Sequence, residues 1–409
     1  MSGWPLVSLR DVSESVQYGY TASASHEVDG PLFLRITDIA QEALDWSSVP
    51  KCEISDRDLE RFRLRANDLV VARTGATVGY AKFLKNPPEA VFASYLVRFR
   101  IRRDVDAGFI GSIVQSEFYK AWVRSQAGGS AQPNANAQVL GAFPLHLPPL
   151  DQQRRIASIL GAYDDLIEVN RRRVAVLEGM ARGLFEEWFV RFRFPGHEKH
   201  KVIDTSYGPL PEGWKWTAFS ALASFANGFA FKPSDFEADG LPIIKIPELK
   251  NGITTKTPYN SGANVPQRLH VKNGDLLFSW SGTFAVSEWT DGPGLLNQHL
   301  FLVAPGTLVG RGFLRTALRH AMPRFLSQGV GATMQHIRRA ALDDTGLALP
   351  TMGSTLEQAD LLLSKLYDQT VVVRRQNQNL AAARDLLLPR LISGELPVAT
   401  AERALEVAA

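Results

Sequence analysis

Two stretches of the chain place apolar residues in alternating steps of three and four, which is the spacing of one face of a helix. The first stretch follows Pro148-Pro149, opens at Asp151 as a candidate N-cap and continues to residue 192. The second covers 355–396, where Pro389 should end or kink the helix. About forty residues of helix rise roughly 60 Å, which is longer than a compact domain needs.

The apolar positions of these two predicted helices form a seam of the coiled-coil type. The seam residues are Ile156, Tyr163, Leu166, Asn170, Leu177, Leu363, Leu366, Val373, Asn377, Leu380 and Leu387. Asn170 and Asn377 each stand beside arginines, and a polar residue buried on a seam costs stability but fixes register and partner. We therefore expect the helices to pair as an antiparallel coiled coil. Packing inside an ordinary helical bundle is the alternative.

Short runs rich in β-forming residues, separated by Gly, Pro and Asn turns, precede each predicted helix. They are Pro31–Ile36, Asp68–Ala72 and Tyr95–Ile101, then Ile243–Ile246, Asp275–Trp280 and Leu300–Val303. This order predicts an α+β fold with two mixed domains, 1–150 and 211–350, followed by long helices at 151–192 and 355–396. Between the halves, 193–210 is expected to be a polar linker, with His197 and His200 solvated rather than binding metal.

The second half of the chain repeats motifs of the first half in the same order. The matching pairs include Gly3-Trp4 with Gly213-Trp214, Asn67–Val70 with Gly274–Leu277, Gly108–Ile110 with Gly312–Leu314, and Leu147-Pro148 with Leu349-Pro350. The offset drifts slowly while the order is kept, which indicates an old duplication with small changes in loop length. A duplicated chain of this kind predicts pseudo-twofold symmetry.

Composition changes this picture only a little. The chain has 409 residues, a formal net charge of +3 and a single cysteine, Cys52. The weak positive charge is compatible with nucleic acid without indicating it, and one cysteine excludes a disulfide framework or a cysteine-based zinc cluster. The sequence has no apolar run long enough to span a membrane and no signal-peptide pattern, so we expect a cytoplasmic protein.

The junctions between the predicted domains and helices carry the most specific motifs. These are Gln132-Pro133-Asn134, Phe143–Leu150 with Gln152-Gln153, Pro211–Trp214, and Leu391–Leu396. With these motifs the chain resembles the specificity subunit of type I restriction-modification enzymes over nearly its whole length. The second junction departs from the pattern, because Thr333–Ile337 replaces the Gln-Pro-Asn type sequence and Thr351 stands where a second proline is usual.

The resemblance implies a DNA-binding subunit without a catalytic site of its own. In that family each recognition domain reads one half of a split target, and the helices hold the halves at a fixed distance. The partners implied are double-stranded DNA, two modification (adenine methyltransferase) subunits and two restriction subunits. S-adenosylmethionine, ATP and Mg²⁺ are then expected in the partner subunits, with no cofactor or metal bound by this chain.

Residues suited to reading DNA lie at strand ends and turns in both halves. Arginine and lysine suit guanine, asparagine and glutamine suit adenine, and small residues let the backbone approach. The candidates are Arg35, Thr37, Arg73, Thr74, Gly75, Gln132 and Asn134, then Lys245, Trp280, Ser281, Gly282, Gln335 and His336. Phosphate contacts are expected from Arg57, Arg61, Arg63, Arg65, Arg338 and Arg339. For any one of them, a solvated surface side chain is the alternative.

Patterns that would indicate an enzyme are incomplete. Asn86-Pro87-Pro88 begins like an adenine methyltransferase motif, but Glu89 stands where an aromatic must stack on the flipped base. Asp235, Glu248 and Lys250 imitate a metal-dependent nuclease, although Pro247 interrupts the strand that would carry Glu248. Two alternatives therefore stay open: a nuclease built on these three residues, and a scaffold that binds only proteins through its helices.

Overall fold

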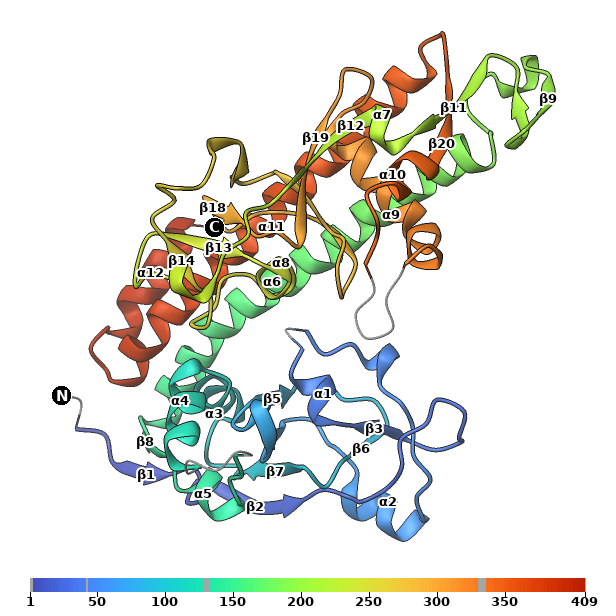
Figure 1. The fold of residues 1–409 in the computed structure, drawn as a ribbon. Coiled ribbons are helices and arrows are strands. Elements are labelled where there is room, and N and C mark those ends of the chain that lie inside the picture. Colours follow the sequence, from blue (N-terminus) through green and yellow to red (C-terminus); the bar gives the residue numbers. More distant parts are fainter. Residues whose placement is uncertain (1–2, 42, 128–132, 330–335, 409) are drawn as a thin grey trace. The chain divides into compact units, whose positions relative to one another are not determined.

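The computed structural model describes residues 3–41, 43–127, 133–329 and 336–408 (Figure 1). The chain divides into two compact units. Unit 1 comprises residues 1–167 and 380–409, and unit 2 comprises residues 168–379. Both long helices therefore contribute one part to each unit, and each unit is a set of strands and short helices built on a pair of long helical segments.

Unit 1 contains a four-stranded antiparallel sheet in the order β2-β7-β4-β5. Its strands are β2 (Ser13–Tyr18), β4 (Asp68–Ala72), β5 (Ala81–Leu84) and β7 (Leu96–Ile101). Two smaller pairings are β3 (Leu32–Leu34) parallel to β6 (Ala90–Phe92), and β1 (Leu6–Ser8) antiparallel to β8 (Pro144–His146). The helices are α1 (Ile36–Ile39), α2 (Asp56–Phe62), α3 (Ala107–Val114), α4 (Glu117–Gln126) and α5 (Ala137–Gly141). Strand β4 is buried along its whole length, and after Asp68 its sequence is apolar from Leu69 to Ala72.

Unit 2 repeats this topology in the order β12-β19-β16-β17. Its main strands are β12 (Ala223–Asn227), β16 (Leu276–Ser279), β17 (Ala285–Glu288) and β19 (Leu300–Pro305). The parallel pair becomes β13 (Leu241–Ile244) with β18 (Gly294–Leu296), flanked by β14 (Tyr259–Asn260) and β15 (His270–Val271). The pair β11 (Trp214–Ala218) with β20 (Gly346–Pro350) corresponds to β1 with β8. The helices are α7 (Phe219–Leu222), α8 (Ile246–Asn251), α9 (Arg311–Ser327) and α10 (Ala341–Asp344).

One pair of glycines shows that the backbones of the two units follow the same path at equivalent positions. A Cβ on Gly19 would lie 2.2 Å from the carbonyl oxygen of Ala93, and a Cβ on Gly228 would lie 2.2 Å from that of Asn297. In each unit the next residue forms a parallel bridge with the same partner. Only glycine allows this approach of two backbones, so the duplication inferred from sequence extends to a steric detail of the fold.

The long helices are α6 (Leu150–Phe185), continued by a π-helical turn at Glu186–Val190, and α11 (Thr355–Ile392). Helix α6 begins one residue earlier than expected, so Asp151 lies in the first turn and is not the N-cap. There its negative charge still faces the positive end of the helix dipole. Helix α11 continues past Pro389 to Ile392 and ends there. None of the helices in the described residues has the length and apolarity that crossing a bilayer requires.

The two long helices pair antiparallel. In unit 1, Nη1 of Arg384 lies 2.5 Å from Oδ1 of Asp164, and in unit 2, Nη2 of Arg374 lies 2.8 Å from Oε1 of Glu178. Early residues of α6 therefore meet late residues of α11, and later residues of α6 meet earlier ones of α11. The α+β class and the antiparallel helix pair predicted from the sequence are confirmed.

Most of the predicted seam residues lie against a neighbour, with one exception. Ile156, Asn170, Leu363 and Val373 are buried, and Tyr163, Leu177, Leu366, Asn377, Leu380 and Leu387 are half-buried. Leu166 is 51% exposed, whereas Ile167 is 4% exposed. The prediction of Leu166 is therefore wrong, because a seam that passes through Tyr163 and Asn170 in steps of four and three takes Ile167.

The segment expected to be a polar linker contains regular structure. A 3₁₀ turn at His197–Lys199 precedes a hairpin of β9 (Val202–Thr205) and β10 (Gly208–Pro211). Nδ1 of His197 lies 2.9 Å from the carbonyl oxygen of Phe194, a buried residue. Within the described residues, no group of three or more His, Cys, Asp or Glu could hold a metal ion. Buried apolar residues, Phe194 before the hairpin and Leu210 on β10, hold this segment in place, although most of its sequence is polar.

In each unit an equivalent hydrogen bond joins the N-terminus of a domain helix to a long helix. In unit 1 the N–H of Asp106, the N-cap of α3, donates to Oε1 of Gln153 over 2.8 Å. In unit 2 the N–H of Gly310, the N-cap of α9, donates to Oδ1 of Asp360 over 2.6 Å. Such a bond satisfies a backbone donor that would otherwise be left unpaired at an interface. In each unit this hydrogen bond links a domain helix to a long helix.

Candidate nucleic-acid interface

A turn follows the central strand of each main sheet and is fixed by a distant segment of the same unit. In unit 1, Thr74 forms an antiparallel bridge with Asn134, and the N–H of Gly75 donates to the carbonyl of Pro133 over 2.9 Å. In unit 2, Ser281 forms the corresponding bridge with His336. The structure thus brings together residues that lie about sixty positions apart along the chain.

The glycines of these turns adopt a backbone conformation that favours glycine. Gly75 has φ +74° and Gly282 has φ +67°, both in the left-handed region where other residues are strained. Each turn therefore reverses tightly at the end of a buried strand. Arg73, Thr74 and Trp280 are half-buried there, whereas Ser281 is buried, so its side chain is not available to a ligand. A turn fixed in this way can hold a side chain in a defined direction.

Arg73 is the charged residue at the turn of unit 1. Its N–H donates to the carbonyl of Tyr95 over 3.0 Å, which fixes the backbone from which the side chain leaves. The guanidinium carbon lies 5.0 Å from the centre of the Tyr18 ring, and the Tyr18 hydroxyl accepts a hydrogen bond from the N–H of Ala137 at 2.9 Å. Ring and guanidinium are therefore both held in place before any ligand arrives.

Trp280 takes the place of Arg73 in unit 2 and is surrounded by rings. Its ring centre lies 6.0 Å from that of His299, 5.9 Å from that of His336 and 5.8 Å from that of Phe301. Within the described residues, Nε1 of Trp280 and Nδ1 of both histidines are buried without a hydrogen-bond partner. The second turn thus carries aromatic rings where the first carries a guanidinium.

The short helices after the parallel strands hold the next candidates. Arg35 and Lys245 are the N-caps of α1 and α8, and a carboxylate three residues later accepts from each backbone N–H. The predicted strands end too late here, because this capping starts a helix at Ile36 and at Ile246. Arg35 is also bound through its guanidinium to Asp38, at 2.9 Å from Nη2 to Oδ1. The hydrogen bond to Asp38 raises the pKa of Arg35, and this ion pair engages the side chain within the protein.

The remaining candidates are distributed as follows. Thr37 is exposed on α1, and Gln132 and Gln335 lie outside the described residues. Among the phosphate candidates, Arg63 and Arg65 form exposed ion pairs with Glu89 and Glu60, at 3.2 and 2.6 Å. Arg57, Arg61, Arg338 and Arg339 are exposed. Exposed pairs contribute little to stability, so their arginines can exchange a carboxylate for a phosphate at small cost.

The nuclease alternative has no support in the geometry. Glu248 is a buried capping residue that accepts from the Thr257 hydroxyl over 3.2 Å and from the Lys245 N–H over 3.1 Å. Asp235 accepts from the Lys232 N–H over 2.7 Å, as the cap of its own turn. Glu248 lies on helix α8 and not on a strand, and both carboxylates are engaged in local capping.

Comparison with known proteins agrees with this arrangement. A family model described as type I restriction modification DNA specificity domain matches residues 1–179. The chain is 22% identical over 409 residues to the type I restriction enzyme MjaIX specificity subunit of Methanocaldococcus jannaschii, covering 97% of this chain and 94% of that relative. It is 22% identical over 472 residues to the HindI specificity subunit of Haemophilus influenzae, covering 97% and 100%. Residues 1–179 therefore match a type I specificity domain, and the chain is similar over nearly its whole length to type I specificity subunits.

A solved structure supports the fold. The S subunit of a type I restriction-modification system from M. genitalium superposes with a TM-score of 0.51 at 13% identity, covering 95% of this chain and 96% of that one. Type I specificity subunits are non-catalytic DNA-recognition subunits. This agrees with the structure, in which Asp235 and Glu248 cap local turns and do not form a nuclease site.

Two residues that contact the turns are not among those selected from the sequence. Tyr18 supports Arg73 from strand β2, and His299 lies beside Trp280 just before strand β19. His299 occupies the repeat position of Tyr95, since the carbonyl of Tyr95 accepts from the Arg73 N–H and that of His299 accepts from the Trp280 N–H. The equivalence of His299 and Tyr95 could be found in the sequence repeat only if the strands of the two halves were first paired correctly.

Proposed function

We propose that this specificity subunit reads a split DNA target, with one half of the target contacted by the turn of each unit. The observation that carries the proposal is that two equivalent turns, Arg73–Gly75 and Trp280–Gly282, share one backbone design and differ in side-chain chemistry. A shared scaffold with different reading groups suits two different half-sites. The recognition domains are then 1–150 and 211–350.

The helices 151–192 and 355–396 act in this proposal as the spacer, with 193–210 as the connection between the halves. Readers on one face of the duplex lie about one helical turn, roughly 34–36 Å, apart or a multiple of it. A pair of helices that is seated on each domain by Gln153 and Asp360 keeps such a distance fixed. The bases between the half-sites are spanned and not read.

The same helices offer a surface for the partner subunits. Exposed apolar side chains are frequent on both: Leu166, Val169, Val176, Met180, Leu361, Leu362, Val372 and Leu386. Apolar surface of this kind marks protein interaction sites. We assign it to two modification subunits, with two restriction subunits joining the complex. S-adenosylmethionine, ATP and Mg²⁺ then act in those partners, and the assembly works on DNA in the cytoplasm.

The experiment is methylation-sensitive sequencing of host DNA with the gene present, deleted and restored. We expect adenine methylation at one split motif to disappear on deletion and to return on restoration. A split motif that stays methylated after deletion, in a host with no second copy of the gene, would overturn the proposal. Purified protein incubated with Mg²⁺ and plasmid should leave the plasmid intact, whereas cleavage would revive the nuclease alternative.

A further inference from the structure

The two turns differ in one respect that bears on the target sequence. We infer that Arg73 reads a guanine in the half-site bound by unit 1, and that the second half-site is read without an arginine at the equivalent position. The inference rests on the proposed function, because it concerns which base the first turn selects. Four observations support it: the rigidity of the mounting, the free guanidinium, the chemistry of base edges and the contrast with Trp280.

The backbone of Arg73 is held from both sides. Its N–H donates to the carbonyl of Tyr95 over 3.0 Å, and its own carbonyl accepts from the N–H of Ala135 over 2.8 Å. The following residue, Thr74, is bridged to Asn134. Because the main chain is bonded on both sides, the side chain leaves the sheet in a defined direction. A reading residue needs this, since misplacement by about 1 Å weakens recognition strongly.

The guanidinium is oriented by a ring and is not neutralised by an acid. It lies 5.0 Å from the centre of Tyr18, whose hydroxyl is tied to the Ala137 N–H. No described carboxylate forms an ion pair with Arg73, and its Nε is buried without a hydrogen-bond partner in the described residues. Other arginines of the unit do have acidic partners: Arg35, Arg63, Arg65, Arg98, Arg100 and Arg102. The protein thus holds a planar cation in place and leaves its hydrogen-bonding capacity unused.

The chemistry of base edges assigns the partner. A guanidinium carries N–H donors in a fixed fork and has no acceptor. In the major groove guanine presents two adjacent acceptors, O6 and N7, whereas adenine presents one acceptor beside a donor. A fork of donors therefore matches guanine with two hydrogen bonds and meets an N–H₂ group on adenine. A rigid Arg73 discriminates more sharply than a mobile one, because it cannot rotate to form one hydrogen bond with a base that offers only one acceptor.

Unit 2 supplies an internal contrast at the same place. Trp280 has one ring donor, and its neighbours His299 and His336 each have two ring nitrogens on different edges of the imidazole, of which Nδ1 is buried. None of these groups reproduces the two-pronged contact of an arginine. We therefore expect only the half-site bound by unit 1 to require a guanine that is read by an arginine.

The test uses the subunit assembled with the modification subunits of its own system. Initial methylation rates are measured on duplexes that carry the wild-type motif and on duplexes with every single-base change in either half. The variants are Arg73→Gln and Arg73→Lys, where the lysine keeps the charge but loses the fork. Arg57→Gln is the matched control, because Arg57 is an exposed arginine proposed to contact phosphate.

We expect the wild-type complex to prefer one guanine of the first half-site by roughly 5- to 150-fold over other bases. Arg73→Gln should lose that preference at this single position, and Arg73→Lys, which keeps a donor but not the fork, should retain only part of it. Both variants should keep every preference in the second half-site, which also shows that they fold. Arg57→Gln should weaken all duplexes alike and make the salt dependence shallower. The Lys variant separates geometry from charge, since only loss of the fork explains relaxed selection at constant charge.

Two results would overturn the inference while leaving the split-target function standing. One is an Arg73→Gln complex that keeps all preferences of the wild type. The other is an Arg73→Gln complex that loses activity on every duplex in proportion, as a phosphate contact would. A wild-type complex that shows no split motif at all contradicts the proposed function itself, and the inference falls with it.

Discussion

Nε of Arg315 lies 2.8 Å from Oε2 of Glu288 inside unit 2, with the two side chains 4% and 0% exposed. The strand register and the repeat place these residues where unit 1 has Gly111 and Phe83. There the aromatic ring occupies the space above the glycine, since a Cβ on Gly111 would lie 2.8 Å from Cγ of Phe83. The same site in the duplicated fold is thus an apolar contact in one unit and a buried ion pair in the other.

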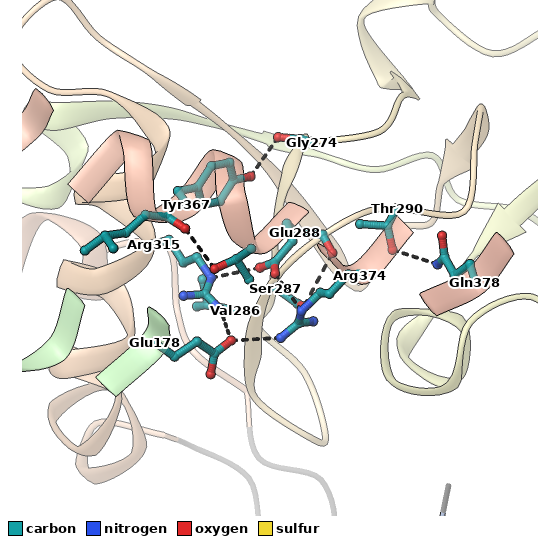
Figure 2. A network of polar contacts seen from close by, with 12 residues as sticks. Glu178, Gly274, Val286, Ser287, Glu288, Thr290, Arg315, Tyr367, Arg374 and Gln378 are labelled. Carbon is teal, nitrogen blue, oxygen red and sulfur yellow. Dashed lines mark hydrogen bonds and ion pairs between the residues drawn. The ribbon is translucent and has the colours of Figure 1, made fainter. Parts of the chain in front are cut away.

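Figure 2 shows that this pair belongs to a larger network joining both long helices to the sheet. Nη2 of Arg374, on α11, lies 2.8 Å from Glu178 on α6, and its Nε lies 2.9 Å from Glu288 on β17. Arg315 and Arg319, on α9, also bind Glu178. Buried charges cost desolvation, and this set is stable only because each charge faces opposite charges. We interpret it as the device that fixes how the second recognition domain sits on its helices.

Removing one charge from the network should therefore be costly. We expect Glu288→Gln to lower the free energy of unfolding by about 3–5 kcal/mol, because Arg315 and Arg374 would each lose one of their two counter-charges and would share Glu178 alone. Glu89→Gln is the matched control: it breaks the exposed pair with Arg63 and should cost less than about 1 kcal/mol. Urea unfolding of the two variants beside wild type checks this. Equal losses in both would show that the network has no special role.

The network also predicts an acid dependence of stability. Burial raises the pKa of Glu178, but the charges of Arg315, Arg319 and Arg374 outweigh it and bring the pKa to about 2 from an ordinary value of 4.5. A carboxyl with a lowered pKa stabilises the fold above its unfolded pKa and loses that contribution as the pH falls toward the folded value. The melting temperature should therefore drop between about pH 5 and about pH 2, the window that the two pKa values define.

The measurement is a set of thermal melts across that range for wild type and Glu178→Gln. The variant should begin with a lower melting temperature near neutral pH and then change less as the pH falls, because it has no carboxyl to protonate at this position. Parallel curves for the two proteins would contradict the role given to Glu178.

Helix α9 should tolerate no side chain where it crosses α11. A Cβ on Gly312 would lie 2.3 Å from the carbonyl oxygen of Leu363, a backbone atom that cannot turn aside. We expect Gly312→Ala to destabilise the protein by about 1–3 kcal/mol or more. Gly161→Ala is the control: a Cβ on this helical glycine would have no neighbour within 4 Å, so alanine should stabilise by about 0.5–1 kcal/mol. Opposite signs in denaturant unfolding are the expected result, and a stable Gly312→Ala variant would refute the close contact.

The long helices could be predicted from sequence because their signal is local and repeats many times. Helix α11 follows steps of three and four from Ala359 to Leu391, and both ends of that series are buried. In α6 two apolar residues stand side by side at Leu166 and Ile167, and spacing alone does not decide which faces the partner. The sequence predicts strand ends at Ile36 and Ile246, where short helices begin instead because a capping carboxylate three residues after each N-cap outweighs local β-preference.

The turns could be found because they repeat, but their supports could not. Arg73 and Trp280 follow equivalent strands, so an alignment of the halves selects both. Tyr18 reaches Arg73 from a strand more than fifty positions away, and only the tertiary fold brings it there. The network around Glu288 could not be predicted from the sequence for a different reason. Its charges come from four elements, and the first half of the chain has Phe83 at the position that corresponds to Glu288.

Exchange of one recognition domain tests the division of labour between the units. Residues 1–150 are replaced by the corresponding region of another specificity subunit, with the junction placed before α6 so that the Gln153 contact to the domain is kept. We expect the methylated motif to change in one half only, because the turn of unit 2 and its supports come entirely from residues 168–379. The reciprocal exchange of 211–350 should change the other half. A motif altered in both halves by a single exchange would mean that the units do not read independently, and an unaltered motif would favour a scaffold that binds only proteins.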